Sequence, residues 1–185
     1  DVIMTDQVQT KITEKPRRLT SARHQVVFTI LKPFLYFFVW IAFNFHAQRF
    51  QNERKHQPYF ILSNHNGALD PFMLAQGFHQ PIYFVASDHI FRLGLASRLI
   101  EYLVAPIPIV KSQIDIRAIR QILTIQKEGG TVCLFPSGNR SFTGPEMPIP
   151  PATAKLVKQL KCPVLLYHFD GGYLTSPRWA RSHRR

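Results

Sequence analysis

The stretch YFILSNHNGALDPFMLAQGFHQPIYFVAS, residues 59–87, decides the fold of this chain. It opens with the apolar run YFILSN at 59–64, which has the length and composition of a β-strand. Asp70 followed by a proline is a typical helix start, and it predicts a short helix over 71–78. The apolar run IYFVAS at 82–87 predicts a second strand. Strand, helix and strand in this order predict a parallel β–α–β arrangement.

The same alternation continues along the rest of the chain. In DIRAIRQILTIQKEGG, apolar residues recur at helical spacing, Asp115 can cap the helix start and Gly129 can end it. Strands that alternate with helices predict an α/β fold, a layered and largely parallel sheet flanked by helices. The further predicted elements are a helix over 89–103, an extended piece over 106–111, a helix over 115–130, a strand over 131–136, a helix over 151–160 and a buried strand over 163–169.

Composition indicates a folded domain with an anionic partner. The chain has 185 residues, 45% hydrophobic and 18% charged, which favours one domain with a real core and excludes disorder. Its formal charge of +12 indicates nucleic acid, an anionic membrane surface or phosphorylated substrates. Because the sequence carries no nucleic-acid-binding motif, we expect no nucleic-acid partner. Cys133 and Cys162 lie in apolar runs, so we expect buried thiols in a reducing compartment and no metal site.

The N-terminal part of the chain predicts contact with a membrane. Residues 1–24 are polar and basic, and we expect them to be poorly ordered. The apolar run at 26–45 is long enough to cross a bilayer, but Lys32 and Pro33 interrupt it and basic residues lie on both sides. We therefore expect a membrane-associating helix within 25–50 that lies in, or dips into, one leaflet. A spanning helix and a buried core helix are the alternatives.

His65 and Asp70 stand together where the first predicted strand ends. In open α/β sheets, ligands bind at the carboxyl ends of the strands. A turn through Gly67 can bring the Asp70 carboxylate to one imidazole nitrogen of His65, which leaves the other nitrogen free to accept a proton. This pattern predicts a general base with its orienting carboxylate. The alternative is a loop histidine beside an ordinary helix cap.

The stretch LFPSGNRSF, residues 134–142, is the second candidate for function. Gly138 permits a turn whose backbone amides point at an anion, and Arg140 offers a planar fork for a phosphate or carboxylate. The alternative is an ordinary turn at a strand end with a solvated arginine. Ser137 lacks the Gly-x-Ser-x-Gly context of a hydrolase nucleophile, so we do not expect it to act as one.

Together these stretches resemble the bacterial 1-acylglycerol-3-phosphate acyltransferase family. The resemblance is carried by Asn-His, four residues and then Asp after one strand, and by Phe-Pro-x-Gly-x-Arg-Ser about 70 residues later. APIPIVK at 105–111 and KCPVLLYHF at 161–169 lie where that family has its weaker motifs. The resemblance extends over roughly residues 26–175.

The resemblance implies transfer of an acyl group from acyl-CoA or acyl-carrier protein to the hydroxyl of a lysophospholipid such as 1-acylglycerol-3-phosphate. His65 would remove the proton of the hydroxyl as it attacks the thioester, and Asp70 would orient His65. Neither a covalent acyl-enzyme nor a cofactor is then required. The residues implied at the acceptor site are Asn64, Lys111, Ser137, Gly138, Asn139 and Arg140.

The resemblance also implies a location and a domain organisation. The enzyme would sit at the cytoplasmic face of the cell membrane, peripheral or re-entrant, with the lysophospholipid, the acyl donor and the anionic membrane surface as its partners. We expect a basic segment over 1–24, the membrane-associating helix over 25–50 and an acyltransferase domain over 51–185 that is cut short at its C-terminus.

Three positions depart from the family pattern. Ser137 replaces a glutamate, Asn139 a threonine and Lys111 an arginine. Because that glutamate belongs to the acceptor site, the acceptor here is expected to be another lysophospholipid or hydroxylated lipid. The same departures leave an alternative function, a non-catalytic lipid-binding protein on an acyltransferase scaffold.

Overall fold

The computed structural model describes residues 20, 22–87, 94, 98, 101, 102, 104–110, 115–141 and 148–175. The predicted basic segment 1–24, the predicted helix over 89–103, Lys111 and the end of the chain lie largely or wholly outside the described residues.

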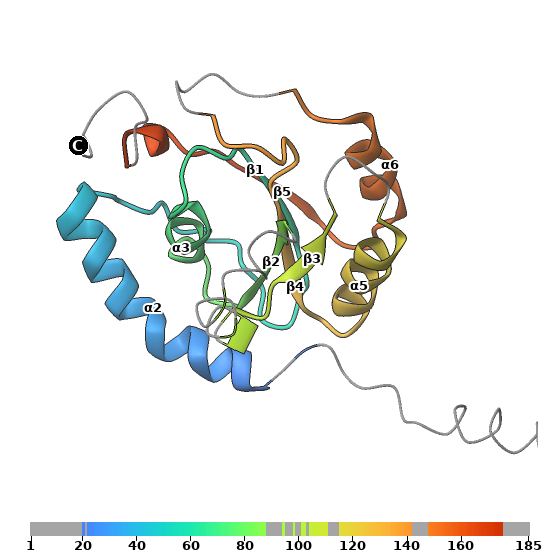
Figure 1. Ribbon diagram of the computed structural model, residues 1–185. Coiled ribbons are helices and arrows are strands. Elements are labelled where there is room, and N and C mark those ends of the chain that lie inside the picture. Colours follow the sequence, from blue (N-terminus) through green and yellow to red (C-terminus); the bar gives the residue numbers. More distant parts are fainter. Residues whose placement is uncertain are drawn as a thin grey trace, which may run out of the picture.

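Five parallel strands form one sheet at the centre of the molecule (Figure 1). Their order across the sheet is β3-β2-β4-β1-β5, so β1 lies between β4 and β5. Because all the pairs are parallel, the carboxyl ends of the strands meet at one edge. The predicted α/β fold is confirmed. The strands are β1 (Phe60–Ser63), β2 (Ile82–Ser87), β3 (Ile107–Ile109), β4 (Thr131–Leu134) and β5 (Val164–Tyr167).

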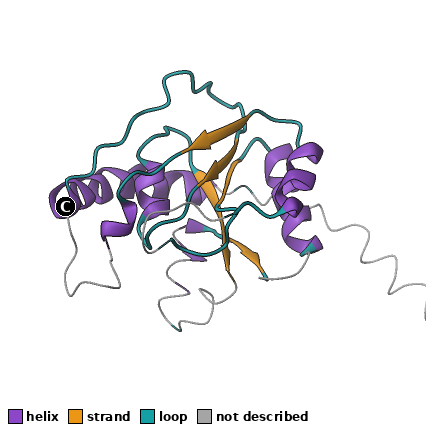
Figure 2. Cartoon of the chain, turned by 90° about the horizontal axis from the view of Figure 1, so that it is seen from above, coloured by secondary structure: helices purple, strands orange, loops and turns teal. Residues whose placement is uncertain are grey.

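Helices cover both faces of the sheet (Figures 1 and 2). One core cluster joins α2 and α3 to alternate strand residues such as Ile61 and Cys133. The other joins α5 and α6 to the opposite residues, such as Phe60 and Val132. This alternation follows from the two-residue period of a strand that is buried on both faces. The helices are α2 (Ala22–Phe43), α3 (Asp70–Ala75), α5 (Ile116–Lys127) and α6 (Pro151–Gln159), followed by the 3₁₀ helix η2 (Gly172–Thr175).

The start and end of α5 agree with the sequence prediction. The Asp115 carboxylate accepts hydrogen bonds from the backbone N–H of Arg117 at 3.0 Å and of Ala118 at 3.1 Å. The N–H of Val110, next to β3, also donates to this carboxylate at 3.0 Å. These hydrogen bonds lower the pKa of Asp115, and the bond from the Ala118 N–H has the largest effect. Gly129 ends the helix with a φ of 86°, a conformation that favours glycine.

Helix α2 corrects the prediction that Lys32 and Pro33 interrupt the apolar run. It is one helix of 22 residues that continues through Pro33. The proline removes one backbone hydrogen bond, but contacts along the helix hold it on the domain. His24 contacts the carbonyl of Ile82 through Nε2 at 3.2 Å, Lys32 donates from Nζ to the carbonyl of Phe78, and Val39 is fully buried.

Strand β5 corrects the prediction of a buried strand over 163–169. It lies at the edge of the sheet with β1 as its only neighbour among the described strands. Val164 and Leu166 are exposed, Leu166 by 83%. Leu165 and Tyr167 face the opposite way and pack against the core cluster of α2 and α3. The apolar sequence indicated burial on both faces, whereas only one face of β5 is covered by described residues.

Candidate active site

His65 and Asp70 form a hydrogen-bonded pair at the carboxyl edge of the sheet. His65 follows β1, and Asp70 is the first residue of α3. His65 Nδ1 lies 2.8 Å from Asp70 Oδ2. The Asp70 side chain is fully buried, whereas the His65 side chain is 20% exposed. The contact predicted from the spacing of these residues is therefore present, with the imidazole reaching the surface and the carboxylate behind it.

The tight turn between the two residues fixes the tautomer of His65. Asp70 Oδ2 also accepts hydrogen bonds from the backbone N–H of Asn66 at 2.6 Å and of Gly67 at 2.9 Å. An oxygen that accepts from two amide N–H groups carries no hydrogen of its own, so the hydrogen shared with His65 belongs to Nδ1. His65 Nε2 then carries a lone pair, and no described residue forms a hydrogen bond with it. It can accept a proton from a ligand.

Phe135, directly after β4, fixes the plane of the imidazole. Its ring stacks on that of His65 with centroids 4.5 Å apart and planes inclined by 25°. Phe84 stacks behind Phe135 at 6.4 Å. The backbone N–H of Ser141 donates to the carbonyl of His65 at 2.7 Å. Because β4 and β1 are neighbours, the sheet brings together the two sequence motifs that lie about 70 residues apart.

The loop after Phe135 forms the predicted turn. Gly138 has a φ of 64°, and its N–H donates to the carbonyl of Phe135 at 3.0 Å. The Ser137 hydroxyl donates to the carbonyl of Asn139 at 2.9 Å, inside the loop. Arg140 is half-buried and precedes Ser141, which is bonded to His65. The structure therefore places the Ser137–Arg140 loop beside the histidine, while Lys111 lies outside the described residues.

The side-chain amide of Asn64, which was predicted to contact substrate, forms hydrogen bonds with the backbone of Phe169. Its Oδ1 accepts from the Phe169 N–H at 2.7 Å, and its Nδ2 donates to the Phe169 carbonyl at 2.8 Å. The Asn66 side chain donates to the same carbonyl at 3.3 Å. Sequence reasoning did not find the contributions of Asn66, Phe135 and Phe169. The phenylalanine before Pro136 was a visible signal. Phe169 ends the KCPVLLYHF block, but the sequence does not indicate its contact with Asn64.

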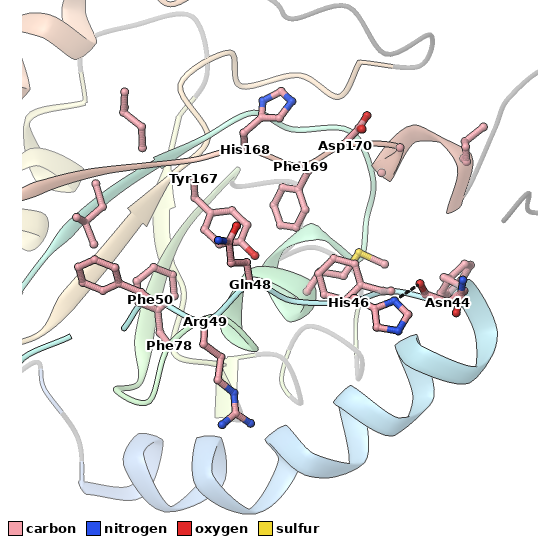
Figure 3. A pocket seen from close by; sticks show the side chains of 18 of the residues that line it. Asn44, His46, Gln48, Arg49, Phe50, Phe78, Tyr167, His168, Phe169 and Asp170 are labelled. Carbon is pink, nitrogen blue, oxygen red and sulfur yellow. Dashed lines mark hydrogen bonds between the residues drawn. The ribbon is translucent and has the colours of Figure 1, made fainter. Parts of the chain in front are cut away.

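A cavity of about 880 Å³ lies beside this region, between the segment after α2 and β5 (Figure 3). Its wall includes the aromatic side chains of Phe50, Phe78, Tyr167 and Phe169. Burial raises the pKa of Tyr167. His65 and Asp70 do not line this cavity, although Gly172 does. Within the described ranges, no group of His, Cys, Asp and Glu side chains could hold a metal ion.

The fold and the site define an α/β protein with a candidate general base at the carboxyl edge of a parallel sheet. Residues 43–165 match the family model described as Acyltransferase, and the chain belongs to this family. The match covers well over half of the chain. The resemblance found in the sequence motifs is thus confirmed at the level of the family.

The fold is also similar to a solved structure, that of the 1-acyl-sn-glycerophosphate (LPA) acyltransferase PlsC from Thermotoga maritima. The two share 18% sequence identity with a TM-score of 0.63, and the match covers 85% of this chain. It covers 63% of the PlsC chain, so this chain spans less than two thirds of that protein. A search of curated proteins found no match.

Proposed function

We propose that this protein is a membrane-associated glycerolipid acyltransferase. It transfers a fatty acyl group from acyl-CoA or acyl-carrier protein to the hydroxyl of a lysophospholipid such as 1-acylglycerol-3-phosphate. The observation that carries the proposal is the 2.8 Å contact of His65 Nδ1 with the buried Asp70, because Nε2 then forms no hydrogen bond with any described residue. Membership of the acyltransferase family supports the reaction class, and the solved PlsC structure supports the acceptor class.

His65 acts as the general base. Its Nε2 takes the proton of the acceptor hydroxyl as that oxygen attacks the thioester carbonyl carbon. The new C–O bond forms, the C–S bond breaks, and the leaving thiolate receives the proton from the imidazolium to give the free thiol. Asp70 stabilises the imidazolium through the Nδ1 hydrogen bond. The reaction needs no covalent acyl-enzyme.

The Ser137–Arg140 loop holds the acceptor headgroup. The Ser141–His65 hydrogen bond ties this loop to the catalytic histidine, so a phosphate beside it brings the neighbouring glycerol hydroxyl toward Nε2. Arg140 supplies a bidentate contact, and Lys111 adds a point charge. Ser137 and Asn139, which replace residues typical of the family, change the polar groups that the loop offers to the headgroup, so the acceptor panel includes lysophosphatidate and other lysophospholipids.

Helix α2 binds the membrane with its outer face. Its 22 residues, about 33 Å in length, are enough to cross a bilayer. Only 6% of its most apolar window is buried, which argues against a core helix. Large apolar side chains such as Phe34, Phe37 and Trp40 point to solvent, whereas Lys32 is turned onto the domain. Because His24, Lys32 and Val39 hold one side of α2 on the domain, the proposal places the helix in the interface of an anionic leaflet, here the cytoplasmic one, rather than across the bilayer.

The test is thiol release from palmitoyl-CoA with a panel of lysolipids in detergent. We expect His65→Ala to lower turnover to background while the protein stays folded. The matched control is His79→Ala, because His79 also pairs with a carboxylate, that of Glu53 at 3.0 Å. This second pair lies before the amino end of β2, whereas His65 lies at the carboxyl edge of the sheet. Equal turnover in His65→Ala and His79→Ala would refute the proposed mechanism.

A non-catalytic lipid-binding protein is the second candidate function. The replacement of family residues by Lys111, Ser137 and Asn139 favours it. This function predicts that the protein binds vesicles but releases no thiol with either donor. Turnover that depends on His65 rules it out.

A further inference from the structure

We infer that Asn64 is a positioning residue of this site, whose carboxamide holds the segment 169–172 against the buried side of Asp70. The inference rests on the proposed function and concerns the same pair of residues. Asn64 acts on Asp70 through that segment, and Asp70 in turn orients His65. Asn64 is thereby assigned a role other than contact with substrate.

The carboxamide of Asn64 extends the pairing of β1 with β5 by one step. The backbone register of these strands ends at Ser63 opposite Tyr167. Asn64 follows, and its side chain supplies an acceptor to the Phe169 N–H at 2.7 Å and a donor to the Phe169 carbonyl at 2.8 Å. A two-point contact of this kind fixes both the distance and the orientation of the peptide groups that it binds. Both polar atoms of the amide are thereby bound to the Phe169 backbone, and their orientation is set by that backbone.

The segment held in this way lies directly on the catalytic turn. Phe169 is buried and contacts the rings of Tyr167 and Phe45, at 5.1 Å and 6.3 Å. A Cβ atom at Gly172 would lie 3.1 Å from the Cβ of Asn66 and 3.4 Å from Oδ1 of Asp70. Position 172 therefore approaches so closely that a larger residue would have to displace its neighbours.

This contact covers one oxygen of Asp70. Oδ1 is buried and forms no hydrogen bond with any described residue. Water admitted to Oδ1 would solvate the carboxylate and weaken its attraction for the imidazolium of His65, because the local dielectric constant would rise. The hydrogen bonds of Asn64 hold the segment 169–172 in place, and the small size of Gly172 lets this segment lie close over Oδ1. Both residues therefore help to exclude water from the Asp70 carboxylate.

The experiment compares kcat and the acceptor KM of Asn64→Ala with those of Gln80→Ala. Gln80 is a matched control, because its carboxamide also binds backbone groups, the carbonyls of Arg54 at 2.8 Å and Gln57 at 3.3 Å, at the opposite end of the sheet. We expect Asn64→Ala to lower kcat about 10- to 100-fold with KM within about twofold of wild type. Gln80→Ala should retain both values.

A second variant and a second readout keep the inference testable without turnover. Gly172→Ala should also lower kcat, because its new methyl group would lie 3.1 Å from the Cβ of Asn66, so that the segment 169–172 or the catalytic turn must shift. In both variants, hydrogen exchange should accelerate at the amides of Asn66 and Gly67, which donate to Asp70. In Gln80→Ala it should not.

Three outcomes would overturn the inference. They are wild-type kcat in both variants, an effect of Asn64→Ala confined to the acceptor KM, and unchanged exchange at Asn66 and Gly67. Failure of the proposed function is recognised separately. His65→Ala would then release thiol at the wild-type rate, whereas hydrogen exchange at Asn66 and Gly67 would still show whether Asn64 holds the segment 169–172.

Discussion

Replacement of Asp70 by asparagine separates the charge of this residue from its shape. Oδ2 accepts from His65 Nδ1, from the Asn66 N–H and from the Gly67 N–H. In Asp70→Asn the amide oxygen must occupy this place, because an NH₂ group there would face two backbone N–H groups. His65 therefore keeps its hydrogen on Nδ1. What the variant loses is the negative charge that stabilises the imidazolium.

The size of this loss follows from the geometry. Opposite unit charges about 4 Å apart interact by about 4 kcal/mol at an effective dielectric constant of about 20. That energy corresponds to about a 10³-fold change in rate if the proton is fully transferred in the transition state. Because transfer is partial, we expect kcat to fall about 10²- to 10³-fold. The amide NH₂ takes the buried position of Oδ1, which costs about 1–3 kcal/mol of unfolding free energy.

Asp70→Ala is less informative, because it leaves the N–H groups of Asn66 and Gly67 without their acceptor. Each buried donor without a partner costs about 1–3 kcal/mol, so loss of activity and loss of fold would be mixed. The assay is therefore kcat for thiol release with Asp70→Asn, together with urea unfolding.

Glu53→Gln is the matched control for Asp70→Asn. The Glu53 side chain is 4% exposed and accepts from His79 Nδ1 and from the backbone N–H groups of His79 and Gln80, away from the carboxyl edge of the sheet. We expect this variant to lose stability but to keep kcat. If Asp70→Asn turned over within about threefold of Glu53→Gln, the role of the Asp70 charge would be refuted.

Three further predictions concern other parts of the molecule. Phe34→Glu should weaken binding to anionic vesicles at least tenfold in a flotation assay. Phe34 is 70% exposed, and burial of its ring in lipid contributes about 2 kcal/mol to binding. The control variant Phe34→Leu should bind nearly as well as wild type. Unchanged binding of Phe34→Glu would remove α2 from the membrane contact. Ser137→Glu restores the family residue and should shift the preferred acceptor toward lysophosphatidate in the lysolipid panel; an unchanged order of acceptors would contradict this. The pKa of Asp115 is lowered from its ordinary value of 3.8, so its stabilising effect is complete above that pH and is lost as the pH falls through the folded-state pKa. In urea unfolding near neutral pH, Asp115→Ala should therefore be less stable than wild type by about 1 kcal/mol, the usual cost of a lost helix cap. This difference in unfolding free energy should become smaller in acid. A difference that does not change with pH would show that the carboxylate charge is not its cause.

The features that depend on residues close together in the chain were predictable from the amino-acid sequence. Alternating apolar runs gave the order of strands and helices, because the period of hydrophobic residues reflects local backbone geometry. The pairing of His65 with Asp70 was predictable since a single turn through Gly67 joins them. The caps of α5 at Asp115 and Gly129 were predictable for the same reason.

The features that depend on the order of the strands could be read from the folded molecule alone. Because β1 lies between β4 and β5, Phe135 stacks on His65 from one side and Phe169 is held by Asn64 from the other. The exposed face of β5 follows from its place at the edge of the sheet. The continuity of α2 through Pro33 depends on contacts along its packed side. No local pattern encodes these contacts, since they join residues far apart in the chain whose proximity is set by the packing of the whole sheet.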